Sequence, residues 1–272
     1  MTSQSPFAGG DQSYLRDVQY RDGTKLDIRA TLHQRFSTSE LLFPDFEAGL
    51  IEWRADLAVI ECGTGTGRFW DNVVAPRSIS LTLTDLSPGM VQLAVDRAGE
   101  NAFERVEGRE CDVQDLPFDD DSFDLAIANH MLYHAPDPDR AVAELSRVLR
   151  PDGTLLAATN GYGHMKEMNE AIAEVFGRGN EGLYEVFGID TGEARLRERF
   201  GSITWHAFDN DLMVDDPAAA IAYGLSFPPG ETATDEEAAA FARAIGRRFV
   251  DGRMHIRTRA GAFVCSAPRS RV

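Results

Sequence analysis

Apolar positions along the 272-residue chain shift from helical spacing near the start to strand-like runs further on. Across residues 14–36, apolar and aromatic residues recur at helical spacing, which predicts helices before the first strand. Residues 57–60 form a short apolar run that predicts a buried strand, and residues 78–84 alternate apolar and polar positions, which predicts a second. Later segments continue this alternation of elements, with helices predicted at 164–176, 193–200, 217–225 and 234–250 and strands at 202–208 and 254–265. The pattern predicts an α/β fold.

The turn after the first strand follows Glu61 and carries glycines at positions 63, 65 and 67. Glycine lets the backbone turn through positive φ and approach a ligand without a Cβ in the way. A strand, such a turn and a helix from about Arg68 place a small molecule at the carboxyl edge of a parallel sheet. A Walker phosphate loop and a dinucleotide G-x-G-x-x-G turn both fail at position 68, which is arginine. A structural turn without a ligand stays open at this point.

The second predicted strand ends in Asp85 and Leu86. A carboxylate that closes this strand can accept both hydroxyls of a ribose, so Asp85 indicates adenosine binding. Rossmann dehydrogenases have the same feature at a similar spacing, and Asp85 therefore does not identify the reaction. Ser87 and Pro88 also fit the N-cap and first position of a helix, and the two interpretations are compatible.

Three further motifs follow in order at residues 109–118 (RECDVQDLPF), 122–129 (SFDLAIAN) and 143–155 (AELSRVLRPDGTL). Together with the glycine turn, they resemble the core of class I S-adenosylmethionine (SAM) methyltransferases of the methyltransferase-11 type. The resemblance covers about residues 55–160. One departure is Asp152, where the family usually has glycine, and it lies in a turn.

The resemblance implies a Rossmann-like, seven-stranded, mostly parallel sheet with an antiparallel last strand and helices on both faces. It implies SAM as the cofactor and S-adenosylhomocysteine (SAH) as its product. By position in the motifs, Asp112 would accept from the adenine amino group and the Val113 backbone amide would serve the adenine ring. The cofactor-binding residues expected from the motifs and their surroundings are Glu61, Gly63, Thr64, Gly65, Asp85, Leu86, Met90, Asp112, Val113 and Asn129.

Residues 1–50 are expected to form a helical lid over the cofactor, as in methyltransferases of this type. Residues 51–272 would then form the SAM-binding domain, with a helical insert at about 161–200 above the active site. Arg35 is expected to meet the methionine carboxylate of SAM. The expected substrate contacts are Tyr14, Tyr20, His33 and Phe36 of the lid together with Tyr133, Tyr162 and His164, although each lid residue could instead only pack the helices onto the sheet.

The expected catalytic residues are His130 and His134, which follow the fourth strand. Histidine titrates near neutrality and is the usual general base when the methyl acceptor is a hydroxyl group. The two residues are four apart and would share a face of a helical turn. No convergent carboxylate accompanies them, and we expect no metal. Methyl transfer is an in-line displacement for which the protein mainly positions the nucleophile.

The composition of the chain limits which partners and which cellular location we expect. A formal net charge of −17 argues against nucleic acid, whose phosphates require a basic surface. No apolar run reaches the length of about 18 residues that a membrane span needs. The first residues have neither a basic start nor an apolar core, which favours a cytoplasmic location. The three cysteines form no C-x-x-C pair, and no zinc site or disulfide framework is expected. Exchange of the N-terminal helices within a homo-oligomer stays open.

The predicted function is SAM-dependent methylation of a small molecule on oxygen, nitrogen or carbon, with natural-product biosynthesis as the expected setting. A phenolic or heteroaromatic acceptor is favoured because His130, Tyr133 and His134 suit its polarisation. A quinone C-methyltransferase is one alternative, against which the acidic composition and the lack of an amphipathic membrane-binding stretch argue. A SAM-binding regulatory module without catalysis is another, and the intact cofactor motifs argue against it.

Overall fold

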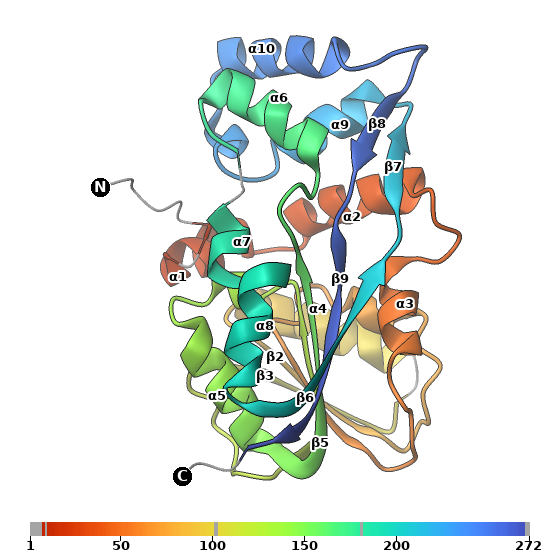
Figure 1. The fold of residues 1–272 in the computed structure, drawn as a ribbon, viewed down its shortest axis with the longest axis vertical. Helices are drawn as coiled ribbons and strands as arrows, with labels where there is room; N and C mark the ends of the chain where they lie inside the picture. The colour runs from red at the N-terminus through yellow and green to blue at the C-terminus, as the bar shows by residue number, and fades with distance from the viewer. Residues whose placement is uncertain (1–6, 9, 101–102, 180–181, 270–272) are drawn as a thin grey trace.

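The computed structural model describes residues 7–8, 10–100, 103–179 and 182–269, and its centre is a seven-stranded sheet (Figure 1). The strand order is β3-β2-β1-β4-β5-β9-β6. The first five of these run parallel, and β9 is antiparallel to both β5 and β6. The predicted sheet with its antiparallel last strand is thus confirmed. The strands are β1 Ala58–Cys62, β2 Ser80–Asp85, β3 Arg105–Glu110, β4 Phe123–Asn129, β5 Leu149–Asn160, β6 Phe200–Phe208 and β9 Ala260–Pro268.

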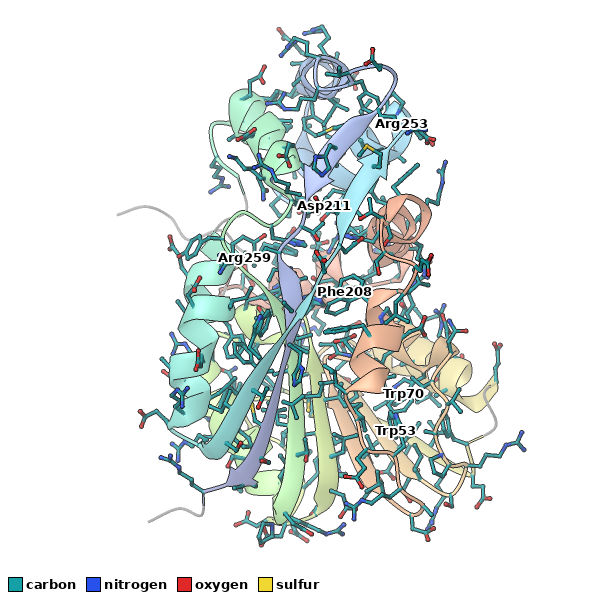
Figure 2. The ribbon with its side chains drawn as sticks, turned by 45° about the vertical axis from the view of Figure 1, so that its right-hand side comes forward. Trp53, Trp70, Phe208, Asp211, Arg253 and Arg259 are labelled. Atoms are coloured by element: carbon teal, nitrogen blue, oxygen red, sulfur yellow. The ribbon has the colours of Figure 1, made fainter. Side chains whose placement is uncertain are left out.

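Helices cover both faces of this sheet because successive side chains of its strands point to opposite sides. Along β1, Val59 belongs to one buried cluster and Ile60 to the other, and Leu125 and Ala126 of β4 divide in the same way. The first cluster includes α4 (Pro88–Glu100) and the short turn η2 (Arg68–Asp71), with α3 (Phe43–Gly49) packed against it. The second includes α5 (Pro138–Val148), α7 (Gly182–Phe187) and α8 (Ile189–Arg197). Figure 2 shows Trp70 of η2 beside Trp53 on the first face.

The helix predicted from about Arg68 is only the single 3₁₀ turn η2. Pro76 follows shortly afterwards, and proline lacks the N–H that a continuing helix needs. β2 then begins at Ser80, so the chain has no room for a longer helix here. The glycine turn packs directly against α4, because a Cβ on Gly67 would lie only 2.7 Å from Ala94 Cα of that helix.

A cap stands above the carboxyl edge of the sheet (top of Figure 1). It consists of α6 (Lys166–Phe176), α9 (Pro217–Gly224), α10 (Asp235–Gly246) and a two-stranded antiparallel sheet of β7 (Asp211–Val214) and β8 (Met254–Arg257). α6 packs against α9, α10 and β8. Two further short segments are 3₁₀ turns: η3 (Leu132–His134) follows β4 of the large sheet, and η4 (Gly230–Thr232) follows α9 of the cap.

The cap differs from the predicted insert at 161–200. Only α6 of that insert belongs to the cap, whereas α7 and α8 lie lower, against η3, α5 and β6. The single strand predicted at 254–265 is also wrong, because Thr258 and Arg259 divide it into β8 in the cap and β9 in the large sheet. Figure 2 shows Phe208, Asp211 and Arg259 at the level where β6 leads into β7 and where β8 leads into β9.

The N-terminal segment contains the expected helices, in the order α1 (Gln12–Tyr14), the π-helical turn η1 (Leu15–Gln19) and α2 (Thr24–Phe36). α2 lies between the sheet and the cap and contacts α9 and β7 (Figure 1). No helix among the described residues combines the length and the apolar character that crossing a bilayer requires.

Candidate active site

A cavity of about 480 Å³ lies where the carboxyl ends of β1, β2 and β4 meet α2 and the cap. A cavity of this size at this edge is the usual ligand site of an open α/β sheet. Most of the expected residues line it: Glu61, Gly63, Thr64, Gly65, Asp85, Leu86, Asp112, Val113, Asn129, Tyr20, His33, His130, Tyr133, His134 and His164. Met90, Arg35, Tyr14, Phe36 and Tyr162 do not.

The glycine turn needs its glycines for two separate reasons. Gly63 and Gly65 have φ of 65° and 54°, in the left-handed region that other residues rarely adopt. A Cβ on Gly63 would also lie 2.6 Å from Met131 Cβ, in the segment that follows β4. The turn therefore brings bare backbone to the cavity surface.

Asp85 connects this turn to the end of β2. Its Oδ2 accepts from the Gly65 backbone N–H at 3.0 Å and its Oδ1 from that of Ser87 at 2.9 Å. Burial raises the pKa of Asp85, and the backbone hydrogen bonds act in the opposite direction. Each carboxylate oxygen keeps further acceptor capacity toward the cavity, which fits the expected contact with two ribose hydroxyls.

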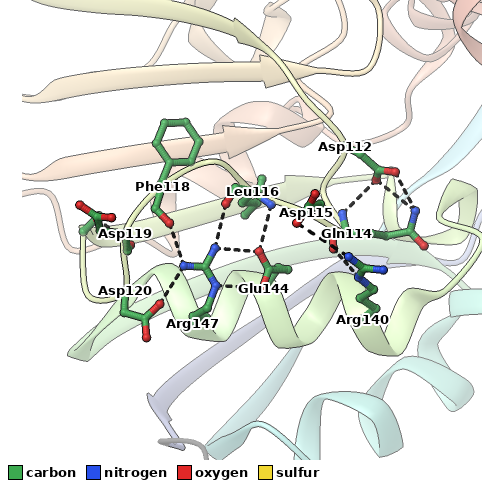
Figure 3. Close-up of polar contacts among 11 residues, drawn as sticks. Asp112, Gln114, Asp115, Leu116, Phe118, Asp119, Asp120, Arg140, Glu144 and Arg147 are labelled. Carbon is green, nitrogen blue, oxygen red and sulfur yellow. Dashed lines mark hydrogen bonds and ion pairs between the residues drawn. The ribbon is translucent and has the colours of Figure 1, made fainter.

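The loop after β3 holds Asp112 in a rigid setting (Figure 3). Asp112 Oδ1 accepts from the Gln114 backbone N–H at 2.9 Å. Glu144 of α5 accepts from the Leu116 N–H at 2.9 Å, and Arg147 donates to the carbonyls of Leu116 and Phe118 at 2.8 and 2.7 Å. Because α5 fixes the loop at several points, Asp112 is preorganised at the cavity wall. Its Oδ2 also accepts from Gln12 Nε2 of the lid at 2.6 Å.

Glu61 is buried at the end of β1. Its Oε2 accepts from Thr64 Oγ1 and from Trp70 Nε1, both at 2.7 Å. Burial raises the pKa of Glu61 to about 7, although these two hydrogen bonds favour its charged form. The residue thus presents a buried carboxyl group, oriented through one oxygen, to the cavity.

His134 is held by the lid through both ring nitrogens. Nδ1 lies 2.7 Å from the Phe7 carbonyl oxygen and Nε2 lies 2.8 Å from the Tyr20 hydroxyl. A carbonyl only accepts, so Nδ1 carries the proton and Nε2 accepts from Tyr20; this tautomer is inferred from the partners. Burial lowers the pKa of His134 to about 3. Because both ring nitrogens of His134 are hydrogen-bonded to the lid, the residue holds the lid in place and has no free nitrogen to accept a proton from a methyl acceptor.

His130 has a different environment. Its backbone has φ of 52°, and its ring lies 5.0 Å from that of Phe43. Burial lowers its pKa to about 4, which keeps the imidazole neutral near pH 7. His33 is likewise neutral, with its pKa lowered by burial to about 4. His164 accepts from the Arg259 backbone N–H through Nδ1 at 3.1 Å, so its Nε2 carries the proton and acts as a donor.

Arg29 is a cavity residue that the sequence interpretation missed. Its Nε donates to Ser226 Oγ and its Nη2 to the Ser226 carbonyl, both at 3.1 Å. The guanidinium lies 5.5 Å from the ring centroids of Phe7 and Phe227. Arg29 thereby joins the lid to the cap segment after α9. A signal existed in the sequence, because Arg29 and His33 are four residues apart on one face of the predicted helix.

The structure corrects the expectation for Arg35. Its guanidinium pairs with Asp216 at 3.1 Å, its side chain is 51% exposed, and it lies outside the cavity. The cavity side of α2 carries residues 26, 29, 30, 33 and 34, and position 35 falls on another side of the helix. Arg35 is therefore not placed to meet the methionine carboxylate.

Four other expected contacts also lie outside the cavity. Met90 and Phe36 are buried in the protein core. Tyr162 is exposed, and its ring is nearly perpendicular to that of Tyr184. Tyr14 donates to Glu231 of η4 and accepts from Gln19 Nε2 at 2.9 Å. Lys25 also bonds Glu231, which makes this carboxylate the second tether of the lid to the cap.

The strand order defines a Rossmann-like fold. The glycine turn and the carboxylates that follow β2 and β3 make one edge of its sheet suitable for a nucleoside. Residues 60–157 match the family model described as a methyltransferase domain. This part of the chain is therefore similar to SAM-dependent methyltransferase domains, and SAM is the cofactor that this family uses.

Two relatives illustrate the similarity. The 27-O-demethylrifamycin SV methyltransferase of Amycolatopsis mediterranei is 31% identical over 173 residues, which are 63% of this chain and 62% of the relative. A malonyl-[acyl-carrier protein] O-methyltransferase of Geobacter sulfurreducens is 29% identical over 74% of each chain. The chain spans 62%, 55% and 54% of the length of the first three curated relatives it matches.

Solved structures share the fold at low identity. The YcgJ protein of Bacillus subtilis superposes with a TM-score of 0.57 at 19% identity, over 82% of this chain and 99% of that one. A Haemonchus contortus phosphoethanolamine N-methyltransferase, crystallised with phosphomonomethylethanolamine and SAH, has a TM-score of 0.58 at 15% identity. It matches 95% of this chain and 60% of its own length.

Proposed function

We propose that the chain transfers a methyl group from SAM to a small acceptor molecule enclosed between the sheet edge, α2 and the cap. The observation that carries this proposal is that one cavity includes both the cofactor motifs and residues of the cap. Asp85, Asp112 and the glycine turn would hold the nucleoside part. The acceptor side combines aromatic rings with the neutral histidines His130 and His164, which suits a compact molecule with one or two polar groups.

SAM, when bound, supplies an electrophilic methyl group. The protein has three tasks: to align the acceptor, to exclude water, and to remove a proton where the acceptor is a hydroxyl group. The lid and cap close over the site through Arg29 and Glu231. His164 would orient the acceptor as a hydrogen-bond donor, and His130 is the imidazole available as the base. His134 holds the lid.

A phenolic or other natural-product hydroxyl is the acceptor class we favour. The relative that is 31% identical is named for O-demethylrifamycin methylation, which supports a hydroxyl acceptor. The neutral state of His130 near pH 7 supports it as well, because a base must be unprotonated to accept a proton.

Calorimetric titration with SAM, SAH and NADH tests the cofactor assignment. We expect SAM and SAH to bind the wild-type chain and NADH not to bind. Asp85→Ala should abolish SAM binding, while Asp96→Ala, on the exposed side of α4, should leave it unchanged. A wild-type chain that binds no SAM would refute the proposal. Transfer of an isotopically labelled methyl group to a panel of phenols, amines and activated carbons would then identify the acceptor atom.

A further inference from the structure

Buried polar atoms without a partner gather at the cavity. Among the described residues, such side-chain atoms are Glu47 Oε1, both amide atoms of Asn129, Asn160 Oδ1 and Arg195 Nε. All of these residues except Arg195 line the cavity. Buried polar groups are otherwise almost always hydrogen-bonded, because leaving one unpaired is costly. The unpaired atoms therefore indicate where a ligand supplies the missing partner.

Glu47 is the least expected member of this group. It lies on α3, one turn after Phe43, and is only 2% exposed. It lines the same cavity as Glu61. Burial, with the nearby Glu61 carboxylate, raises the pKa of Glu47 well above its usual range, and no positively charged group in the described part of the chain counteracts this. Two buried carboxyl groups that face one cavity in this way provide a site for a cation.

The position of these carboxyl groups along the sheet indicates which cation. Asp112 follows β3 and Asp85 ends β2, and these are the proposed adenine and ribose contacts. The next strands in the sheet are β1 and then β4. A ligand that extends in this direction places its amino-acid end over the end of β1, where Glu61 lies, and of β4, where Asn129 lies. The amino-acid end of SAM carries an α-ammonium and an α-carboxylate group.

We propose that Glu47 is the counter-ion of the cofactor's α-ammonium group, beside Glu61, and that the Asn129 amide faces the α-carboxylate. This inference rests on the proposed function, since it assumes SAM as the cofactor. Glu47 is a binding residue in this assignment and takes no part in proton transfer. Its unpaired Oε1 gains a charged donor, and the ammonium group favours the charged form of Glu47, which burial otherwise disfavours.

The test compares three ligands by calorimetry on the full chain: SAM, SAH and 5′-methylthioadenosine. SAM and SAH both have the α-ammonium group, and 5′-methylthioadenosine lacks the whole amino-acid end. Glu47→Gln removes the charge at nearly constant volume. The matched control is Glu52→Gln, five residues further along in an exposed position. We expect Glu47→Gln to weaken SAM and SAH about tenfold or more and to leave 5′-methylthioadenosine within about twofold.

A stability readout separates binding from folding. Without ligand, Glu47→Gln should melt at the same temperature as the wild type or higher, because the amide replaces a carboxyl group whose charged form burial disfavours. The rise in melting temperature that SAH causes should shrink. If Glu47→Gln does not fold, Glu47→Asp replaces it, since that variant keeps the charge but withdraws it, and the same loss restricted to SAM and SAH is expected.

Three results would overturn the assignment. Equal loss for all three ligands would make Glu47 a structural residue. Loss for SAM but not for SAH would place it at the sulfonium centre instead. Unchanged SAM and SAH binding in Glu47→Gln would remove it from the site. All three leave the proposed function standing, whereas absence of SAM binding by the wild-type chain would refute the function itself.

Discussion

At the scale of single residues, the partners of a histidine decide its role more than its type does. His130 and His134 are both neutral at pH 7 and both line the cavity. Both ring nitrogens of His134 form hydrogen bonds with the lid, to Phe7 and Tyr20, which are 127 and 114 residues away in sequence. No local pattern could reveal contacts at that separation. The sequence therefore located the two imidazoles correctly in the cavity, but it could not distinguish a base from a tether.

His130→Asn tests the base. Asparagine suits the left-handed backbone at this position, where φ is 52°, better than most residues. With a hydroxyl acceptor we expect kcat to fall by about 10²–10⁴-fold, because a positioned general base contributes that much. The SAM dissociation constant, measured by calorimetry, should stay within a few-fold. Unchanged kcat in steady-state assays would remove His130 from proton transfer.

His134 and Tyr20 should be coupled in stability. His134→Ala and Tyr20→Phe each remove the hydrogen bond between the two side chains, and His134→Ala also removes the one to Phe7. We expect each to lower the free energy of unfolding in urea by about 1–3 kcal/mol. The double variant should cost less than the sum, with a coupling energy of about 0.5–1.5 kcal/mol. Strict additivity would show that the hydrogen bond contributes nothing.

At the scale of elements, local patterns predicted those whose own residues carry a clear burial pattern. The apolar run before the glycine turn and the alternation in β2 gave their strands correctly, because burial on a sheet imposes these patterns directly. The three helices of the cap were also predicted from their spacing, but its two-stranded sheet was not. β7 and β8 are four residues each and about forty residues apart, and they form a sheet only by pairing with each other. The helical spacing of α2 was recognised, but its cavity face was not.

Arg29 and Arg35 of α2 form a matched pair for testing that face. Arg29 is bonded to Ser226 and stacked among aromatic rings, whereas Arg35 forms a half-exposed ion pair with Asp216. We expect Arg29→Met to lower the free energy of unfolding by about 1–3 kcal/mol and to raise the KM for the acceptor. Arg35→Met should change the free energy of unfolding by less than about 1 kcal/mol and leave the KM values for SAM and for the acceptor unchanged. Similar effects of the two substitutions, in urea unfolding and steady-state kinetics, would contradict the assigned face.

At the scale of the whole molecule, the chain joins a sheet, at whose edge we propose that the cofactor binds, to a cap that is built from distant segments. The sequence could predict that the motif residues of the proposed cofactor side lie together, because each motif is contiguous and their spacing is set by the sheet. The acceptor side could not, because residues of α2, α6 and the segment after α9 meet there only after folding. The same enclosure explains the buried titratable groups: closing the cap removes water from histidines and carboxyl groups that face one cavity.

Those buried groups make stability depend on pH in two opposed ways. Burial lowers the pKa of His33 to about 4 from 6.5, so between these values the unfolded chain binds more protons and stability falls as pH falls. Burial raises the pKa of Glu61 from 4.5 to about 7, so the folded chain binds the extra proton in that window and stability falls as pH rises. Replacing either side chain by glutamine removes one of these two contributions. Melting temperatures measured at pH 7 and at pH 5 then report the remaining dependence of stability on pH.

Relative to the wild-type chain, His33→Gln should raise the melting temperature at pH 5 compared with that at pH 7. Glu61→Gln should raise the melting temperature at pH 7 compared with that at pH 5. His206→Gln, in a partly exposed position of β6, is the control and should reproduce the wild-type difference. The opposite signs are the strict part of the prediction, because burial disfavours the charged form of both groups but a histidine is charged when protonated and a carboxyl when deprotonated. Shifts of the same sign in both variants would mean that at least one of the two groups is not shielded from water by the cap.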